Sequence, residues 1–310
     1  MLSICIPIYN IDVTGLVNAL HKQTERINIT FEIICIDDCS ADLFREKNRE
    51  VCTNYGTYIQ LAQNIGRAKI RNLFLNYVKY NYLLYLDCDS VIVSNDFIKQ
   101  YIDVIKEGRG SVICGGRIYD EKKPERQKTL QWYYGHYKES MPVAIRQLNP
   151  NRSFMTSNFV IHRNIFDQIK FEERLLQYGH EDTLFGFQLK KKHIPIIHVD
   201  NPILNGELEN NAEFITKTEL GLGNLINVLD YVNHDPEFIE DVSILNFYQK
   251  CSKKHITWII VIIFSTFKPL LKFFLSIGFV HLLIFDFYKL GYFSKNYKKM
   301  QLGKRQMIDT

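Results

Sequence analysis

Short apolar runs alternate with stretches of helical spacing along the first third of the chain, and this alternation is what most constrains the fold. The runs lie at residues 3–9, 31–36, 58–61 and 82–86. Helical spacing separates them, at roughly 13–24, 42–53 and 66–79. Strands that alternate with helices in this way indicate βαβ units and therefore an α/β fold with a mostly parallel sheet.

The fourth run ends at Asp87-Cys88-Asp89. Two carboxylates at the tip of a buried strand are typical of a site for a divalent cation such as Mn²⁺ or Mg²⁺, which takes oxygen ligands. Polar residues also follow the first two runs, as Tyr9-Asn10 and Asp37-Asp38. Since parallel sheets bind ligands beyond the carboxyl ends of their strands, we predict that these three strand ends converge on one site.

The composition excludes several classes of protein. The chain has 310 residues and a net charge of +4, too small a basic excess to favour nucleic acid as a partner. The basic residues crowd the last sixth: Lys253, Lys254, Lys268, Lys272, Lys289, Lys295, Lys298, Lys299, Lys304 and Arg305. Seven cysteines without a C-x-x-C pair indicate a reducing cytoplasm and no disulfide framework. The first residues run straight into a strand pattern, so no signal peptide is expected.

Five segments, taken together, resemble the family 2 glycosyltransferases, which use nucleotide-sugar donors. They are residues 4–10, residues 34–40 with the "DDxS" turn, residues 64–72 with "NxGxxxxRN", residues 84–89 with "xLDxD", and residues 178–183 with "GxED". The resemblance spans roughly residues 2–205. It implies a GT-A fold, which is Rossmann-like with a mostly parallel twisted sheet flanked by helices.

The resemblance also implies a domain organisation. A glycosyltransferase domain would occupy residues 1–220, with a nucleotide-binding half at 1–110 and an acceptor-binding half at 111–220. Residues 221–310 would form a helical C-terminal region. The polar and aromatic segment 120–150 is interpreted as a long loop or lid, or alternatively as a packed α-hairpin.

On the donor side, the resemblance implies eight nucleotide-binding residues: Pro7, Tyr9, Asn10, Asp38, Asn64, Gly66, Arg71 and Asp87. Asp38 would accept the uracil N3 proton, Tyr9 would cover the base, and Pro7 would stiffen the turn. Arg71, four residues after Arg67 on one helical face, suits a diphosphate. The alternatives are an Asx turn at Asp37–Asp38 and a solvated basic face around the arginines.

Glu181 and Asp182 carry the acid–base chemistry in this interpretation. An acceptor hydroxyl needs a general base opposite the leaving group, and the resemblance assigns Asp182 to that role and Glu181 to acceptor binding. A single direct displacement predicts inversion at the anomeric carbon. The alternative is that both are favourable charges at the start of the helix at 182–192.

The metal site departs from the family pattern. Asp89 is the expected ligand for Mn²⁺ or Mg²⁺. Members of the family often place a histidine about two dozen residues after the Glu-Asp pair, where this chain has Asn205. His198 is the nearest alternative, but it lies in an apolar run, where a histidine is more often a core residue. Asn is a weak ligand, so we expect weak metal binding.

Two further features concern acceptor and membrane. Trp132 is assigned to acceptor binding because aromatic rings pack on sugar C–H faces, although an aromatic core cluster explains it equally. Residues 256–293 are hydrophobic, yet only about a dozen apolar residues fit between Lys254 and Lys268, short of a span. We expect an interfacial helical hairpin whose lysines meet anionic headgroups, with a dimer-packing helix as the alternative.

The function expected from this reasoning is an inverting glycosyltransferase of cell-envelope polysaccharide biosynthesis. It would use a nucleotide sugar, expected to be a UDP-sugar, and a glycan or lipid-linked oligosaccharide acceptor. It would lie peripherally on the cytoplasmic face of a bacterial plasma membrane. The alternatives are a catalytically silent nucleotide-binding scaffold and a sugar nucleotidyltransferase. The second would need a Gly-rich basic loop after the first strand, where the chain has Tyr9-Asn10-Ile11-Asp12.

Overall fold

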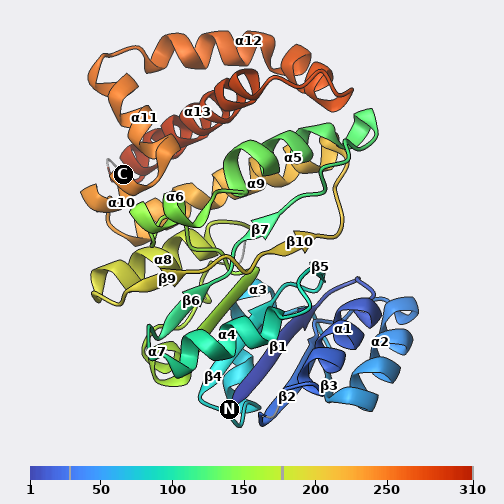
Figure 1. The fold of residues 1–310 in the computed structure, drawn as a ribbon. Helices are drawn as coiled ribbons and strands as arrows, with labels where there is room; N and C mark the ends of the chain where they lie inside the picture. Colours follow the sequence, from blue (N-terminus) through green and yellow to red (C-terminus); the bar gives the residue numbers. More distant parts are fainter. Residues whose placement is uncertain (28, 176–177, 309–310) are drawn as a thin grey trace. The chain divides into compact units, whose positions relative to one another are not determined.

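The computed structural model describes residues 1–27, 29–175 and 178–308, with side chains up to residue 303, so the side chains of Lys304 and Arg305 lie outside it. The chain forms two compact units. Unit 1 comprises Met1–Asp120, His136–Leu176 and Glu181–Glu207, and unit 2 comprises Glu121–Gly135, Gln177–His180 and Leu208–Thr310. Figure 1 shows that unit 1 holds the strands, whereas unit 2 is helical.

A seven-stranded sheet forms the centre of unit 1, in the order β3-β2-β1-β4-β8-β6-β9. Its strands are β1 (Leu2–Ile8), β2 (Phe31–Asp37), β3 (Thr57–Gln60), β4 (Tyr82–Leu86), β6 (Val112–Cys114), β8 (Asn158–His162) and β9 (Ile196–His198). Strand β8 runs antiparallel to both β4 and β6, while the other neighbours are parallel. The tips of β1, β2 and β4 therefore lie along one edge of the sheet.

A small second sheet completes this edge in the order β5-β10-β7. Its strands are β5 (Ser90–Ile92), β10 (Ile203–Asn205) and β7 (Arg117–Ile118). Strand β10 pairs antiparallel with β5 and parallel with β7. Segments more than a hundred residues apart are thereby joined directly after the carboxylate pair of β4.

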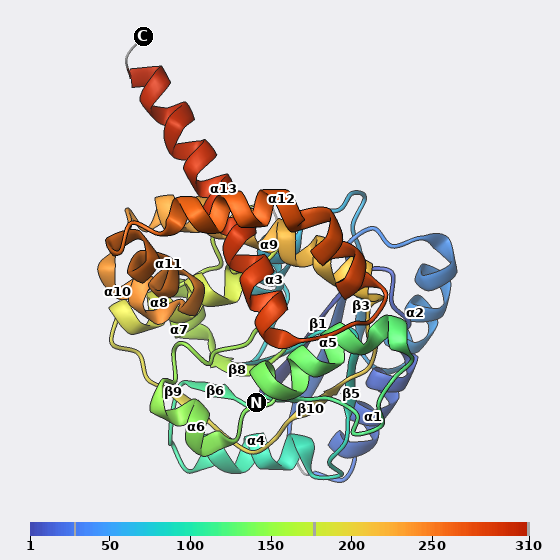
Figure 2. The same cartoon turned by 90° about the horizontal axis from the view of Figure 1, so that it is seen from above.

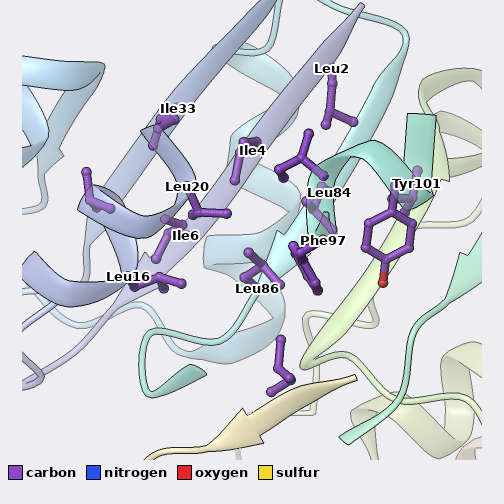
Figure 3. Packing of buried hydrophobic residues seen from close by; sticks show 14 of the residues in the cluster. Leu2, Ile4, Ile6, Leu16, Leu20, Ile33, Leu84, Leu86, Phe97 and Tyr101 are labelled. Atoms are coloured by element: carbon purple, nitrogen blue, oxygen red, sulfur yellow. The ribbon is translucent and has the colours of Figure 1, made fainter. Parts of the chain in front are cut away.

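Helices cover both faces of the large sheet. They are α1 (Thr14–Thr24), α2 (Asp42–Tyr55), α3 (Arg67–Leu73), α4 (Phe97–Lys106), α6 (Val143–Leu148), α7 (Arg163–Gln168) and α8 (Glu181–Lys191). Alternate residues of a strand face opposite sides, so Ile4 packs with Leu20 of α1 and Phe97 of α4, while Cys5 joins the other core. Figure 3 shows the first of these cores.

Unit 2 is built from α5 (Thr129–Tyr134), α9 (Asn211–Tyr231), α10 (Pro236–Asp241), α11 (Ser243–Lys253), α12 (Thr257–Ser276) and α13 (Leu282–Ile308). Its core consists of buried side chains from four of these helices: Leu130, Ile215, Phe264, Leu275, Phe285 and Tyr288. Figure 2 shows α12 crossing α13, whose last turns extend past the other helices of the unit. The crossing is close, because a Cβ at Gly291 of α13 would lie 2.4 Å from the Phe264 ring.

The predicted fold class is confirmed: a mixed, mostly parallel sheet flanked by helices, with a helical C-terminal region. Much of segment 120–150 is helical, which agrees better with the helical alternative than with a long loop, and Tyr134 packs against Phe214 and Phe285 in the aromatic core of unit 2. Two details differ from expectation. The helix expected at 66–79 ends at Leu73 and continues only as a 3₁₀ turn to Asn76. Helix α12 continues past Lys268 to Ser276, and by length and composition it could cross a membrane.

Candidate active site

The ends of β1 and β2 are tied together by polar contacts. The backbone amide of Asn10 donates to the Ser40 hydroxyl (2.8 Å), and the Asn10 side chain accepts from the amide of Ala41 (2.8 Å). Tyr9 is half-exposed beside them. Pro7 lies inside β1, paired with Ile36, so it does not stiffen the turn, which only begins after Ile8.

The two adjacent aspartates after β2 have separate tasks. Asp37 is fully buried and accepts hydrogen bonds from the Ser40 amide (2.7 Å) and the Tyr58 hydroxyl (2.9 Å). The Asp38 carboxylate accepts from the amides of Ile65 (2.7 Å) and Gly66 (3.1 Å). Burial raises the pKa of Asp38 despite these bonds. Asp38 therefore anchors the loop before α3, and each of its oxygens keeps a second lone pair for a ligand.

That loop places α3 at the sheet edge. Asn64 donates to the Asp38 carbonyl (3.3 Å), and Gly66 begins the helix with a φ of +85°, which a residue with a side chain rarely adopts. One turn into α3, the Arg71 side chain is buried and donates to an Asp87 oxygen (2.7 Å) and to the Arg67 carbonyl (3.2 Å). Arg71 is therefore not part of a solvated basic face.

Asp87 is held between two guanidinium groups. Besides Arg71, Arg117 of β7 approaches its other oxygen at 3.5 Å. Burial raises the pKa of Asp87, but the nearby Arg71, Arg67 and Arg117 outweigh it, so this pKa lies below its ordinary value. Arg117 also approaches Glu139 (3.9 Å), and its buried Nε has no hydrogen-bond partner within the described residues.

Sequence reasoning missed Arg117. Nothing in its local pattern marks it, because it lies in a two-residue strand thirty positions after Asp87. Only the pairing of β7 with β10 brings its guanidinium to the carboxylate pair. The neighbouring acidic groups Tyr119, Glu139, Asp87 and Asp89 raise the pKa of Arg117 although burial opposes this, so its positive charge is secure.

Glu181 and Asp182 begin α8, beside the arginines. Glu181 is buried and pairs with Arg67 (3.5 Å) and, more distantly, Arg71 (4.0 Å). One Asp182 oxygen accepts from the amide (2.7 Å) and hydroxyl (3.3 Å) of Thr183. Burial and the adjacent Glu181 raise the pKa of Asp182 to about 6. Such a carboxylate is ionised at neutral pH and remains basic enough to accept a proton.

Asp89 and Asn205 are neighbours through strand pairing. In the β5–β10 register, Asn205 is opposite Ser90, the residue after Asp89. Gly206 donates to the Asp89 carbonyl (3.0 Å), and a Cβ there would lie 2.5 Å from that oxygen, so the close approach requires glycine. The Asn205 amide nitrogen donates to the Glu207 carbonyl (2.6 Å), which leaves the amide oxygen for a ligand.

These groups fit a divalent cation with few protein ligands. The Asp89 carboxylate makes no ion pair within the part of the chain that the structure describes, and burial with the nearby Asp87 raises its pKa. Among the described residues, no three or more His, Cys, Asp or Glu side chains are grouped so that they could hold a metal ion. One carboxylate and one amide oxygen are hard donors, and they leave positions open for substrate phosphates.

His198 behaves as a core residue. Its Nδ1 lies 2.8 Å from Arg146 Nη1, and because an arginine only donates, this nitrogen is the acceptor. The other nitrogen then donates to the Pro150 carbonyl (2.9 Å). Burial and the nearby Arg146 lower the pKa of His198. With both nitrogens engaged, His198 is not available to a metal.

Trp132 belongs to unit 2, on α5, where its ring meets Tyr133 edge-to-face at 5.0 Å. All the other site residues assigned from the sequence lie in unit 1. Within unit 1, the structure thus joins the three strand ends, α3 and the start of α8 through hydrogen bonds and ion pairs.

The chain is similar in sequence to known proteins. The family model for glycosyl transferase family 2 matches residues 3–170. Chondroitin synthase from Escherichia coli is 23% identical over 223 residues, 62% of this chain and 32% of the relative. A teichoic acid poly(glycerol phosphate) polymerase from Staphylococcus epidermidis is 25% identical over 242 residues, 75% of this chain and 32% of the relative. This chain thus spans about a third of the length of these relatives.

Solved structures agree in fold. S. aureus TarS 1–349 in complex with UDP is 20% identical with a TM-score of 0.53, covering 98% of this chain and 91% of TarS. The mannosyltransferase PcManGT from Pyrobaculum calidifontis, in complex with GDP-Man and Mn²⁺, is 10% identical with a TM-score of 0.60, covering 96% and 86%. The match of more than half of the chain to the family model, on a fold of this kind, shows that this protein belongs to glycosyl transferase family 2 and is a glycosyltransferase of GT-A fold.

Proposed function

We propose that this glycosyltransferase moves a sugar from a UDP-sugar to a hydroxyl of a glycan or lipid-linked acceptor during assembly of a cell-envelope polysaccharide. The names of the two curated relatives and the TarS structures with UDP and UDP-GlcNAc support this choice. The observation that carries it is one network of charges, in which Asp87, Arg71 and Glu181 connect the carboxylate tip of β4 to the residue before Asp182.

The donor would lie along the edge formed by β1, β2 and α3. Tyr9 would stack on the base, and a remaining lone pair of the Asp38 carboxylate would accept a hydrogen bond from the uracil N3–H. Asn10, Asn64 and Gly66 would shape the loops around it. Arg71 and Arg117, both held by Asp87, would place two permanent positive charges where a diphosphate leaves.

A divalent cation would be held by Asp89, with the amide oxygen of Asn205 as a weak second ligand. When bound, Mn²⁺ or Mg²⁺ would offset the negative charge of the departing diphosphate. The mannosyltransferase neighbour was solved with Mn²⁺, which supports the choice of ion. Because the amide oxygen of Asn205 is only a weak second ligand, we expect the cation to depend strongly on the nucleotide for its binding.

Asp182 would accept the proton of the acceptor hydroxyl as the oxygen attacks the anomeric carbon. One displacement by one base inverts the configuration at that carbon. Glu181 is occupied by Arg67 and Arg71, so it would orient the arginines and the start of α8 as well as contact the acceptor. Trp132 remains a proposed acceptor platform on α5.

The acceptor and the enzyme would meet on the cytoplasmic face of the plasma membrane, where lipid-linked glycans are extended. The single apolar helix α12, the one candidate span among the described residues, supports a membrane-associated enzyme. Membership of the family favours sugar transfer over the nucleotidyltransferase and the silent scaffold.

The first test is calorimetric titration of UDP, GDP and dTDP into the protein, each with Mn²⁺ and with EDTA. We expect UDP to bind most tightly, and more tightly with Mn²⁺, because Asp38 pairs with uracil and Asp89 anchors the cation. Thymine has the same N3–H, so dTDP should bind more weakly only through its methyl group and its missing 2′-hydroxyl. GDP binding tighter than UDP would overturn the proposed donor class.

Replacing Asn205 with histidine tests the proposed cation site. The Asn205→His variant should lower the Mn²⁺ concentration needed for half-maximal UDP binding about tenfold, because imidazole is a better ligand for Mn²⁺ than an amide. Asn205→Ala serves as the matched control and should raise the Mn²⁺ concentration needed for half-maximal UDP binding. Asp89→Asn should abolish the dependence of UDP binding on Mn²⁺. An unchanged Mn²⁺ dependence in all three variants would place the cation elsewhere.

A further inference from the structure

Helix α12 carries an exposed apolar stripe that covers its whole length. Its large exposed side chains are Trp258, Ile259, Ile262, Ile263, Phe267, Leu270, Phe273 and Phe274. They recur at intervals of three and four residues, which places them on one face of the helix. Trp258 and Phe273, near the two ends, are 56% and 58% exposed. The other exposed residues of α12 are Ser265, Thr266 and Pro269, so this face carries no charge.

The charged residues of α12 point to the opposite side. Lys268 and Lys272 approach the two oxygens of Glu219 on α9 at 3.0 and 3.2 Å. Tyr288 of α13 donates to the same carboxylate (2.5 Å). Burial raises the pKa of Glu219, but the bonds from Tyr288, Lys268 and Lys272 outweigh it, so this pKa lies below its ordinary value. The expectation that these two lysines meet lipid headgroups is therefore wrong.

This polarity is the reverse of an ordinary surface helix, which turns its apolar face to the core. Phe264 and Leu275 do pack inward, and the close crossing of Phe264 over Gly291 holds α12 on α13. The ion pairs with Glu219 fix the rotation of α12 about its axis. The apolar stripe is thus held outward by contacts within unit 2.

The surrounding charge is strongly positive. Residues 242–308 contain ten lysines and one arginine but a single acidic residue, Asp286. Lys253 and Lys254 are exposed directly before α12, and Lys295, Lys298 and Lys299 are exposed on α13. An uncharged apolar stripe flanked by lysines complements a bilayer with anionic headgroups. A second copy of this chain would bring the same positive charge against it.

We propose that the stripe of α12 docks on an anionic lipid bilayer, with the helix lying in the plane of one leaflet rather than crossing it. Lys268 and Lys272 are in the second half of the helix, so a crossing orientation would carry them and Glu219 into the hydrocarbon region, at considerable cost. An in-plane helix keeps this cluster on the aqueous side. Docking of α12 would bring the enzyme to a lipid-linked acceptor, and this purpose rests on the proposed function.

Vesicle flotation tests the docking surface without donor, cation or acceptor. The full chain should float with phosphatidylglycerol vesicles and less with phosphatidylcholine vesicles. The triple variant Ile262→Ser, Phe267→Ser, Phe273→Ser should bind these vesicles with an affinity lower by about tenfold or more. The control Leu43→Ser, Ile145→Ser, Leu148→Ser removes equally exposed apolar residues from unit 1 and should float like wild type. UDP titration of the same variants reports separately on the proposed function, so the two can fail independently.

Two outcomes would overturn the lipid proposal. One is flotation of the α12 triple variant at the wild-type level. The other is a concentration-dependent dimer in solution that the triple variant abolishes while vesicle binding is absent, which would assign the stripe to a second copy. Circular dichroism and thermal unfolding of the variants confirm that each is folded.

Depth-dependent quenching of tryptophan by brominated lipids tests the orientation. The chain has two tryptophans, so Trp132→Phe leaves Trp258 as the single probe, and adding Trp258→Phe with Phe267→Trp moves the probe nine positions along the stripe. At 1.5 Å per residue, the two probes lie about 13 Å apart along the helix axis. An in-plane helix predicts the same quenching depth for both probes. A probe at position 267 that is deeper by this distance would show that α12 crosses the bilayer.

Discussion

Replacing Asp182 with asparagine is expected to lower the rate of sugar transfer by about 10²–10⁴-fold, the usual contribution of a general base, while UDP affinity stays unchanged. Asparagine keeps the shape of the side chain and can still accept from Thr183, but it cannot take a proton from the acceptor hydroxyl. Transfer is measured with a UDP-sugar and a short glycan acceptor, and UDP affinity by calorimetry.

The pH profile of the wild-type enzyme supplies a second readout of the same residue. Since burial and Glu181 raise the pKa of Asp182 to about 6, the ionised form dominates only above that pH. The transfer rate should therefore rise as the pH increases through about 6 and level off above it. A variant that keeps its activity, or a wild-type rate that does not fall below this pH, would remove Asp182 from the role of base.

Replacing Arg71 with methionine is expected to reduce the free energy of unfolding by about 3 kcal/mol, because the Asp87 carboxylate, which is only 20% exposed, loses its closest partner. Asp87 would keep only Arg117, at 3.5 Å instead of the 2.7 Å of Arg71, and Glu181 would keep only Arg67. A loss of this size should lower the melting temperature by roughly 2–4 °C per kcal/mol in a domain of this length.

Arg67→Met is the matched control, one helical turn away on α3. The Arg67 side chain is 53% exposed, compared with 3% for Arg71, so its pair with Glu181 is screened by water. We expect it to contribute less than about 1 kcal/mol. Thermal and urea unfolding of both variants compare the two positions directly. Equal losses would mean that burial of the Arg71 pair does not determine its contribution.

The edge formed by β1, β2 and β4 is the part of the site whose structure the local sequence predicts best. The tips of these strands follow from the alternation of strands and helices, which places Asn10, Asp38 and Asp87 just after them. Gly66 likewise occupies a turn whose positive φ favours glycine. These features depend on a few neighbouring residues, so the pattern of the chain carries them.

Long-range partners were beyond the reach of pattern reasoning. Arg117 reaches Asp87 only because β7 pairs with β10, and His198 gives both ring nitrogens to Arg146 and Pro150 rather than to a metal. The ion pairs of Glu181 with Arg67 and Arg71, which tie it to α3, are likewise not predicted by the local sequence. Each of these contacts joins elements tens of residues apart.

The sequence by itself determined the family, the alternating order of strands and helices, and the polar strand ends, since periodicity and short motifs act over one turn or one strand. The tertiary structure decided which charges neutralise one another. In the folded chain, Asp87 lies between two arginines, and burial raises the pKa of Asp182. Lys268 and Lys272 pair with Glu219, so the apolar face of α12 is exposed. Those outcomes depend on burial and on ion pairs across the chain, which exist only once the elements are packed.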